Sequence, residues 1–181
     1  MNKASRINVI GTSGSGKSTF SKNLAQALSY PHVEMDKVFW GPNWHWPRDE
    51  VFFENLRREI SGDKWVLDGN YTRTLPIKWE RIEMVVWLDF SLPITLYQAV
   101  LRAFRRALSG EEIWEGTGNR ESFRKSFFSR DSIILWTIKT HSSVRLKYEF
   151  YLKDPKYSHI KFVRLKSRRE ANIFLKQVSP G

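Results

Sequence analysis

A glycine-rich junction between a strand and a helix places the strongest constraint on the fold. Residues 6–10 predict a short buried strand, and Phe20, Leu24 and Leu28 then recur at helical spacing. The junction between them consists of Gly11, Thr12, Ser13, Gly14, Ser15, Gly16, Lys17, Ser18 and Thr19. Glycines let backbone N–H groups turn inward, and the start of a helix adds partial positive charge. The junction therefore predicts a site for phosphate groups.

The spacing Gly11-x-x-x-x-Gly16-Lys17-Ser18 satisfies the P-loop pattern in full. The Lys17 ammonium is the expected partner of the β and γ phosphates, and the Ser18 hydroxyl is an expected Mg²⁺ ligand. A serine-rich turn that matches by chance is the alternative, but the strand-to-helix context argues against it. We therefore predict that the whole junction binds a nucleoside triphosphate with Mg²⁺.

The composition is typical of one folded domain. The chain has 181 residues, of which 41% are hydrophobic and 27% are charged, and this is enough to bury a core. Cysteine is absent, which excludes disulfides, thiolate zinc sites and cysteine nucleophiles. No apolar run approaches the roughly 20 residues that span a bilayer. We expect a cytoplasmic protein without membrane contact.

Strands and helices alternate along the rest of the chain. Short strands are predicted at residues 32–34, 65–67, 84–88 and 161–165, of which the second and third are apolar, with helical patterns between them. Such alternation indicates a parallel sheet with helices on both faces.

Helical spacing also predicts which side chains two of the helices bury. The helix that begins near Pro93 is expected to bury Leu96, Val100, Phe104 and Leu108. The helix over residues 132–152 is expected to bury Trp136, Val144, Tyr148 and Tyr151.

Two aspartates at strand ends are candidates for the carboxylate that holds Mg²⁺. Asp68 follows the strand over residues 65–67, and Asp89 follows the strand over residues 84–88. Either aspartate can instead cap a helix or close a turn. The chain contains no Asn-Lys-x-Asp string, which guanine-specific GTPases require, and it is short for a large ATPase. A kinase of small acceptors is therefore the expected class, with Ser18 and one of these two carboxylates as metal ligands. The stretch over residues 68–73 resembles the segment of adenylate-kinase-like enzymes in which the strand-end aspartate organises Mg²⁺, and this resemblance implies Asp68 as the metal carboxylate.

Four separated segments resemble the adenylate-kinase-related proteins called DNA topology modulation proteins, or FlaR-related proteins. The segments are the P-loop and residues 35–44, 65–71 and 164–170. The resemblance implies a three-layer α/β fold like that of nucleoside-monophosphate kinases, with about five parallel strands in a single domain over residues 1–181. It also implies an acceptor-binding insert at about residues 36–62, a basic helical flap at about residues 105–131, and ATP as the donor.

The predicted acceptor side combines a carboxylate with aromatic side chains. Asp36 follows the second strand, where kinases that resemble this chain place a carboxylate facing the acceptor. Trp40, Trp44 and Trp46 lie close by, and they can either line an acceptor pocket or only pack the insert. A hydroxyl acceptor needs a carboxylate base, which Asp36 would supply, whereas a phosphate acceptor needs arginine clamps such as Arg73.

Arginines near the flap are candidates for neutralising charge on the transferring phosphoryl group. Arg102, Arg105 and Arg106 share one helix face because of their spacing, and Arg120, Arg124 and Arg130 follow. Any of these arginines can instead be solvated surface. The residues predicted to be catalytic are Lys17, Asp36, Arg106, Arg120 and Arg124.

The segment after the last strand is expected to approach the adenine ring. Kinases that resemble this chain cover the base from this segment, so Arg168 is a candidate for stacking on it. Ser167 and Glu170 have the spacing of a capping box, which explains both residues without a ligand. The two interpretations are compatible.

The basic excess of the chain lies mostly in the flap region. Lys and Arg total 30 against 19 Asp and Glu, and residues 102–169 alone hold 17 basic against 7 acidic side chains. A lid that closes over a triphosphate predicts this distribution. The predicted function is ATP- and Mg²⁺-dependent phosphotransfer to a small acceptor, either a nucleotide or a nucleoside-like molecule.

Two other functions are compatible with the sequence. The first is a nucleic-acid-associated P-loop protein that influences DNA topology, and a basic lid could also touch DNA as a secondary surface. The second is a P-loop protein that binds nucleotide without turnover. The sequence leaves the acceptor and the oligomeric state open.

Overall fold

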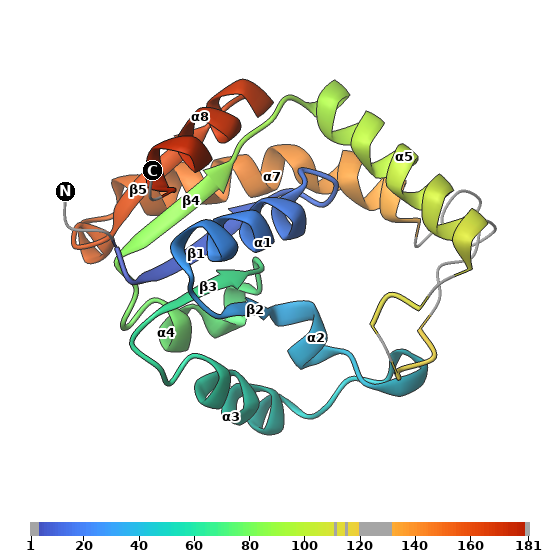
Figure 1. The fold of residues 1–181 in the computed structure, drawn as a ribbon, viewed down its shortest axis with the longest axis horizontal. Coiled ribbons are helices and arrows are strands. Elements are labelled where there is room, and N and C mark those ends of the chain that lie inside the picture. The colour runs from blue at the N-terminus through green and yellow to red at the C-terminus, as the bar shows by residue number, and fades with distance from the viewer. Residues whose placement is uncertain (1–3, 111, 115, 120–131, 180–181) are drawn as a thin grey trace.

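A five-stranded parallel sheet forms the centre of the computed structural model, which describes residues 4–110, 112–114, 116–119 and 132–179 (Figure 1). The strand order is β2-β3-β1-β4-β5. The strands are β1 (Arg6–Gly11), β2 (His32–Glu34), β3 (Trp65–Asp68), β4 (Met84–Leu88) and β5 (Lys161–Leu165). The predicted sheet is confirmed, and each strand lies within one residue of its predicted bounds.

Helices cover both faces of this sheet (Figure 1). On one face lie α1 (Lys17–Leu28) and α8 (Arg168–Val178), and their apolar side chains pack with those of β1 and β4. The other face is covered by α3 (Asp49–Glu59), α4 (Leu75–Lys78) and α7 (Ile133–Lys153). Since the central strands are buried on both sides, their sequences are almost continuously apolar.

The remaining helical elements of the described ranges are α2 (Met35–Phe39), η1 (Pro42–Trp44), η2 (Thr72–Thr74), α5 (Leu92–Ser109) and η3 (Pro155–Tyr157). No helix in the described ranges is both long enough and apolar enough to cross a membrane.

The register of the sheet brings distant parts of the chain to one edge. Val9 of β1 lies beside Asp68 of β3, and Gly11 lies beside Leu88 of β4. Parallel strands end at the same edge of a sheet. The segment after Gly11 and the Asp68 side chain therefore lie next to each other at that edge.

α5 turns a different face inward from the one predicted by hydrophobic spacing. Its buried residues include Thr95, Ala99 and Ala103, whereas Leu108 is 71% exposed. Phe104 and Val100 are also exposed. The inner face carries small residues because α5 packs against the P-loop. A Cβ on Gly14 would lie 2.7 Å from the Thr95 carbonyl oxygen and 2.8 Å from Ala99 Cβ.

The prediction for α7 was correct at three positions and wrong at one. Tyr148 is buried, and Val144 and Tyr151 pack against the same core cluster. Trp136 is 59% exposed instead of buried. The neighbouring Thr137 is buried in its place, and its hydroxyl donates to the Ser13 carbonyl at 3.3 Å. On α7, as on α5, a small residue faces the P-loop.

We predict that Ala99→Leu disturbs the P-loop more than it disturbs the rest of the fold. A larger side chain would push against Gly14, and overpacking costs about 1–3 kcal/mol. We expect a lower melting temperature and at least tenfold weaker ATP binding, measured with a fluorescent ATP analogue. Val100→Leu on the exposed face is the control. Equal ATP affinity in the two variants would contradict the prediction.

Candidate active site

The P-loop lies between β1 and α1 in a conformation that requires glycine. Gly14 has φ +82° and Gly16, which precedes the first residue of α1, has φ +84°. Both values lie in the left-handed region, which side-chain-bearing residues rarely adopt. Ser15 N donates to the Thr12 carbonyl at 3.0 Å, and this bond closes the turn. The loop thus leads directly into the N-terminus of α1, which favours anions.

Asp68 lies at the end of β3 within reach of Lys17 and Ser18. The side chain is only 6% exposed, and burial raises the pKa of its carboxyl group. The Lys17 charge and a hydrogen bond with the Ser18 hydroxyl act in the opposite direction and lower this pKa. The structure therefore brings together the two predicted metal ligands and the P-loop lysine.

This arrangement fits a bound Mg²⁺ ion. Asp68 Oδ1 is buried without a hydrogen-bond partner in the described chain, which is costly unless another group satisfies it. The available donor atoms are a carboxylate and a hydroxyl oxygen, the hard ligands that Mg²⁺ prefers.

Asp89, the alternative metal carboxylate, is committed to two salt bridges. Arg145 Nε donates to Asp89 Oδ1 at 2.8 Å, and Arg164 Nε donates to Oδ2 at 2.8 Å. Both oxygens are thus occupied by arginines, which favours Asp68 as the strand-end carboxylate that faces the P-loop.

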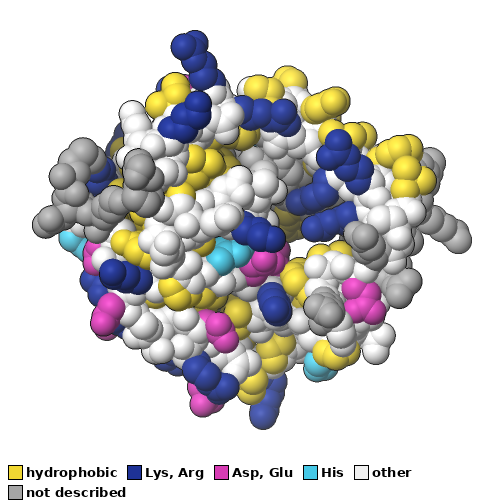
Figure 2. Space-filling model, viewed as in Figure 1, with side chains coloured by type: hydrophobic (Ala, Val, Ile, Leu, Met, Phe, Trp, Pro, Cys, Tyr) yellow, Lys and Arg dark blue, Asp and Glu magenta, His cyan; other side chains and the backbone are white. Residues whose placement is uncertain are grey.

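A groove of about 590 Å³ runs along the P-loop and is bordered by α1, α5 and α8. From α5, it is lined by Arg102, Arg105 and Arg106, which the helical spacing had placed on one face. Figure 2 shows Lys and Arg side chains gathered around a hollow near the centre of the molecule. Arg120, Arg124 and Arg130 lie outside the described residues.

Arg168 also lines this groove, at the start of α8. With the Gln98 amide nitrogen directed at the Gly14 carbonyl (2.8 Å), the Gln98 oxygen accepts from Arg168 Nε at 2.8 Å. Ser167 caps α8 by accepting from Glu170 N at 3.1 Å. The capping interpretation is thus confirmed, and Arg168 is at the same time tied to the P-loop.

Asp36 lies in α2, with its carboxylate exposed. The Tyr71 hydroxyl donates to Asp36 Oδ1 at 2.7 Å. Burial and the Asp36 charge both raise the pKa of Tyr71, so Tyr71 keeps its proton and acts as the donor. β2 pairs with β3 so that Glu34 lies beside Asp68, and Asp36 follows two residues after Glu34. The Asp36 charge accordingly adds to the raised pKa of Asp68.

Arg73, the candidate clamp for an acceptor phosphate, has structural partners instead. Its guanidinium forms an ion pair with Asp49 at 3.0 Å. It also lies over the rings of Phe39 (4.9 Å) and Phe52 (5.4 Å). These contacts hold α3 against α2, which favours a structural role for Arg73.

The turn after β3 contains a residue that the sequence interpretation missed. The Asn70 amide nitrogen donates to the Gly11 carbonyl at 2.6 Å, and Gly11 N donates to Asn70 Oδ1 at 3.1 Å. Asn70 thus bonds both backbone groups of the first P-loop residue. Its position two residues after Asp68 was the only signal in the sequence.

A clasp joins the segment after α5 to η1 and the residue before it, at the lower right of Figure 1. It consists of Gly41, Asn43 and Trp44 on one side and Trp114, Thr117 and Asn119 on the other. The Asn119 side chain, which is fully buried, donates to the Gly41 carbonyl (2.9 Å) and accepts from Trp44 N (2.7 Å). Asn43 N donates to the Thr117 carbonyl at 3.2 Å. The sequence interpretation did not anticipate this contact.

The tryptophans of the insert contact one another. The Trp40 ring packs edge-on against Trp44 and Trp46, with ring centroids 5.6 Å and 6.0 Å apart. The Trp44 ring packs in the same way against Trp114 of the clasp, with centroids 6.0 Å apart. Packing of the insert therefore accounts for much of this cluster. Trp46 is exposed and keeps surface for other contacts.

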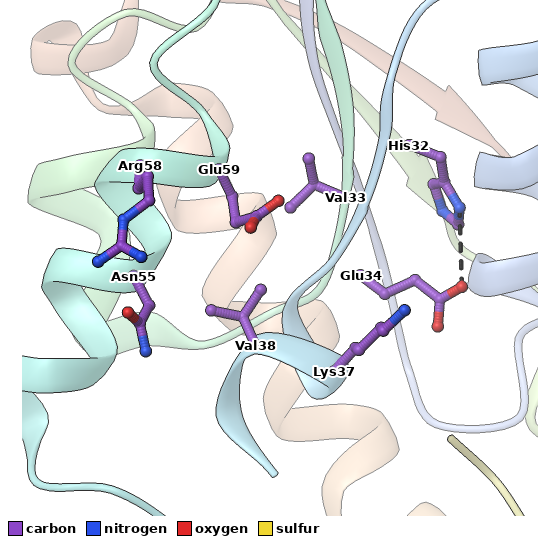
Figure 3. A pocket seen from close by; sticks show the side chains of 8 residues that line it. All are labelled: His32, Val33, Glu34, Lys37, Val38, Asn55, Arg58 and Glu59. Atoms are coloured by element: carbon purple, nitrogen blue, oxygen red, sulfur yellow. Dashed lines mark ion pairs between the residues drawn. The ribbon is translucent and has the colours of Figure 1, made fainter. Parts of the chain in front are cut away.

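A second hollow, of about 300 Å³, lies between β2, α2 and α3 (Figure 3). Its lining mixes both signs of charge, from Glu34, Glu59, Lys37 and Arg58. His32 Nδ1 faces Glu34 Oε1 at 3.7 Å. Neither the P-loop nor Asp36 or Asp68 lines this hollow, so we assign it no role in the site.

Comparison with known proteins supports the fold. No model of a known protein family matches the chain, and no curated protein matches it in sequence. Among solved structures, a gluconokinase from Sinorhizobium meliloti 1021 is similar with a TM-score of 0.50 and 17% identity, over 97% of this chain and 93% of that one. A shikimate kinase from Bacteroides thetaiotaomicron is similar with a TM-score of 0.51 and 13% identity, over 97% of both chains.

The chain therefore has the α/β fold of small P-loop kinases. At these identities the likeness concerns the fold alone. The resemblance to DNA topology modulation proteins stays a prediction.

We predict that the clasp forms in solution and that a disulfide can trap it. The natural chain has no cysteine, so Asn43→Cys with Thr117→Cys introduces only one possible pair. Asn43 N and the Thr117 carbonyl oxygen lie 3.2 Å apart, so the two backbones are adjacent, as a disulfide requires. We expect mild oxidation to remove both free thiols, as measured by mass spectrometry. Asn43→Cys with Asp63→Cys is the control, and equally slow oxidation of both pairs would contradict the clasp.

Proposed function

We propose that this chain is an ATP- and Mg²⁺-dependent phosphotransferase that acts on a hydroxyl group of a small, nucleoside-like acceptor. The observation that carries the proposal is the exposed Asp36 carboxylate, which lies within electrostatic reach of Asp68. Asp68 in turn lies beside Lys17 and Ser18 of the P-loop. Both structural neighbours are kinases by name, which agrees with this class of reaction.

The donor half of the site would hold ATP through the P-loop. Backbone N–H groups and the Lys17 ammonium would bind the β and γ phosphates, while Ser18 and Asp68 would hold Mg²⁺. When bound, the metal neutralises charge on the phosphates. Arg168 would cover the adenine from the start of α8.

Arginines of α5 would stabilise the transferring phosphoryl group. Arg106 lines the groove together with Arg102 and Arg105, so positive charge lies along the phosphate path. One decisive arginine of this kind contributes roughly 10³ to 10⁵ in rate. Arg120 and Arg124, which lie outside the described residues, stay candidates for the same role.

The acceptor half would use Asp36 as a general base. Its carboxylate would accept the proton of the acceptor hydroxyl as that oxygen bonds to the γ phosphorus and ADP leaves. The Tyr71 hydroxyl occupies Oδ1 and would fix the orientation of the carboxylate. Because Arg73 is engaged by Asp49, a hydroxyl acceptor fits this half better than a phosphate acceptor. The exposed Trp46 offers a flat surface for a base or sugar.

The basic excess supports a lid over phosphates more than a DNA surface. Four arginines of the basic region line the P-loop groove, where a triphosphate would pair with them, namely Arg102, Arg105, Arg106 and Arg168. An ATP-dependent enzyme of this kind also fits the cytoplasmic location expected from the sequence. A secondary contact with DNA is compatible with this function.

A screen of nucleosides, nucleotides and sugars with ATP and Mg²⁺ tests the proposal. We expect at least one hydroxyl acceptor to be phosphorylated, and Lys17→Ala to abolish the reaction. Asp36→Asn should reduce the acceptor-dependent rate by roughly 10² to 10⁴ while ATP still binds. Asp63→Asn, at an exposed position outside the site, is the matched control.

Two results would contradict the proposal. One is unchanged kinetics in Asp36→Asn. The other is the absence of any phosphorylated acceptor together with duplex DNA binding that weakens steeply with salt, which would favour the nucleic-acid-associated alternative.

A further inference from the structure

The turn over residues 68–71, here called the β3 turn, reaches three parts of the site. Asp68 faces Ser18 and Lys17, Asn70 bonds Gly11, and Tyr71 bonds Asp36. One short piece of backbone thus carries the metal carboxylate, a contact to the P-loop and a contact to the acceptor carboxylate.

Two buried hydrogen-bond donors and one close packing contact fix the backbone of the β3 turn. The Gly69 carbonyl accepts from Lys78 Nζ at 3.1 Å and from the Asn8 side chain at 3.2 Å, and both donors are fully buried. A Cβ on Gly69 would lie 2.7 Å from Met35 Cβ, so the turn is also packed tightly against the residue before Asp36. Because its backbone is fixed in this way, the turn can hold the P-loop and the acceptor carboxylate at a constant separation.

The Asn70 side chain supplies hydrogen bonds to β1 at the point where backbone pairing between β1 and β3 ends. The last registered pair is Val9 with Asp68, followed by one bond from Gly69 N to the Val9 carbonyl at 3.2 Å. Beyond this point β3 offers no further backbone partner to Gly11, and the Asn70 amide supplies both a donor and an acceptor instead. The side chain thus continues the sheet by one residue into the P-loop.

Asparagine is suited to this position by its chemistry. A primary amide presents one acceptor and two donors, which matches the N–H and carbonyl of a peptide group. Aspartate cannot donate when ionised, and it would face the Gly11 carbonyl oxygen with a negative charge. Alanine would leave both buried groups of Gly11 without their partner.

We propose that Asn70 is a positioning residue that sets the P-loop against Asp68, so that Ser18 and Asp68 come together around Mg²⁺. This inference rests on the proposed function for its metal site, but it concerns residues that bind no substrate themselves. Removal of groups that orient metal ligands typically costs 10- to 100-fold in metal affinity or activity.

The test compares the binding of a fluorescent, non-hydrolysable ATP analogue with and without Mg²⁺. In the natural chain, Mg²⁺ should strengthen binding. In Asn70→Ala, we expect Mg²⁺-free binding to stay within about twofold and the strengthening by Mg²⁺ to fall at least tenfold. The control is Asn55→Ala, at a position on α3 outside the P-loop groove.

Asn70→Asp adds a readout that does not depend on metal or activity. An ionised aspartate accepts but cannot donate, so the bond to the Gly11 carbonyl would be lost and a negative charge would face that oxygen. We expect Asn70→Asp to have a lower melting temperature than the natural chain, measured without nucleotide or metal.

Three results would overturn the inference. They are an equal loss of analogue binding with and without Mg²⁺ in Asn70→Ala, an unchanged strengthening by Mg²⁺ in that variant, and a melting temperature of Asn70→Asp equal to that of the natural chain. The screen for acceptors is independent of these measurements, because analogue binding needs no acceptor. A failure of the proposed function can thus be told apart from a failure of this inference.

Discussion

The adjacency of β1 and β3 is the constraint on which the rest of the site depends. These strands are separated by more than fifty residues along the chain, yet they pair in parallel with Val9 beside Asp68. Since parallel strands end at one edge, the P-loop after β1 and the β3 turn emerge next to each other. β2 pairs with the outer side of β3, and this brings Asp36 to the same edge from the other direction.

Close packing around the P-loop explains several features that look unrelated in sequence. α5 approaches Gly14 with Thr95 and Ala99, so that its small residues face inward and larger apolar ones face outward. The same helix then directs Arg102, Arg105 and Arg106 along the groove. The basic region of the chain is thereby joined to the P-loop through a close backbone approach.

The strands and the P-loop could be predicted from sequence because their signals are local. The strands β1, β3 and β4 are short, mostly apolar runs that end in or lead into glycine or aspartate, and the P-loop has fixed spacing. The inner faces of α5 and α7 were predicted wrongly at positions such as Leu108 and Trp136, because hydrophobic spacing does not reveal contacts of Ala99 or Thr137 with a loop backbone. Asn70 and Asn119 were missed for a related reason: their partners are backbone atoms that lie far away in the sequence.

We infer that the P-loop and Asp68 form one site for a nucleotide and its metal. A crystal structure with an ATP analogue and Mg²⁺ would decide this. We expect phosphates on the P-loop, the metal about 2.1 Å from Ser18 Oγ on the side that faces Asp68, and the base near Arg168. Phosphates bound away from the P-loop, or a metal on the Asp89 side of the sheet, would contradict it.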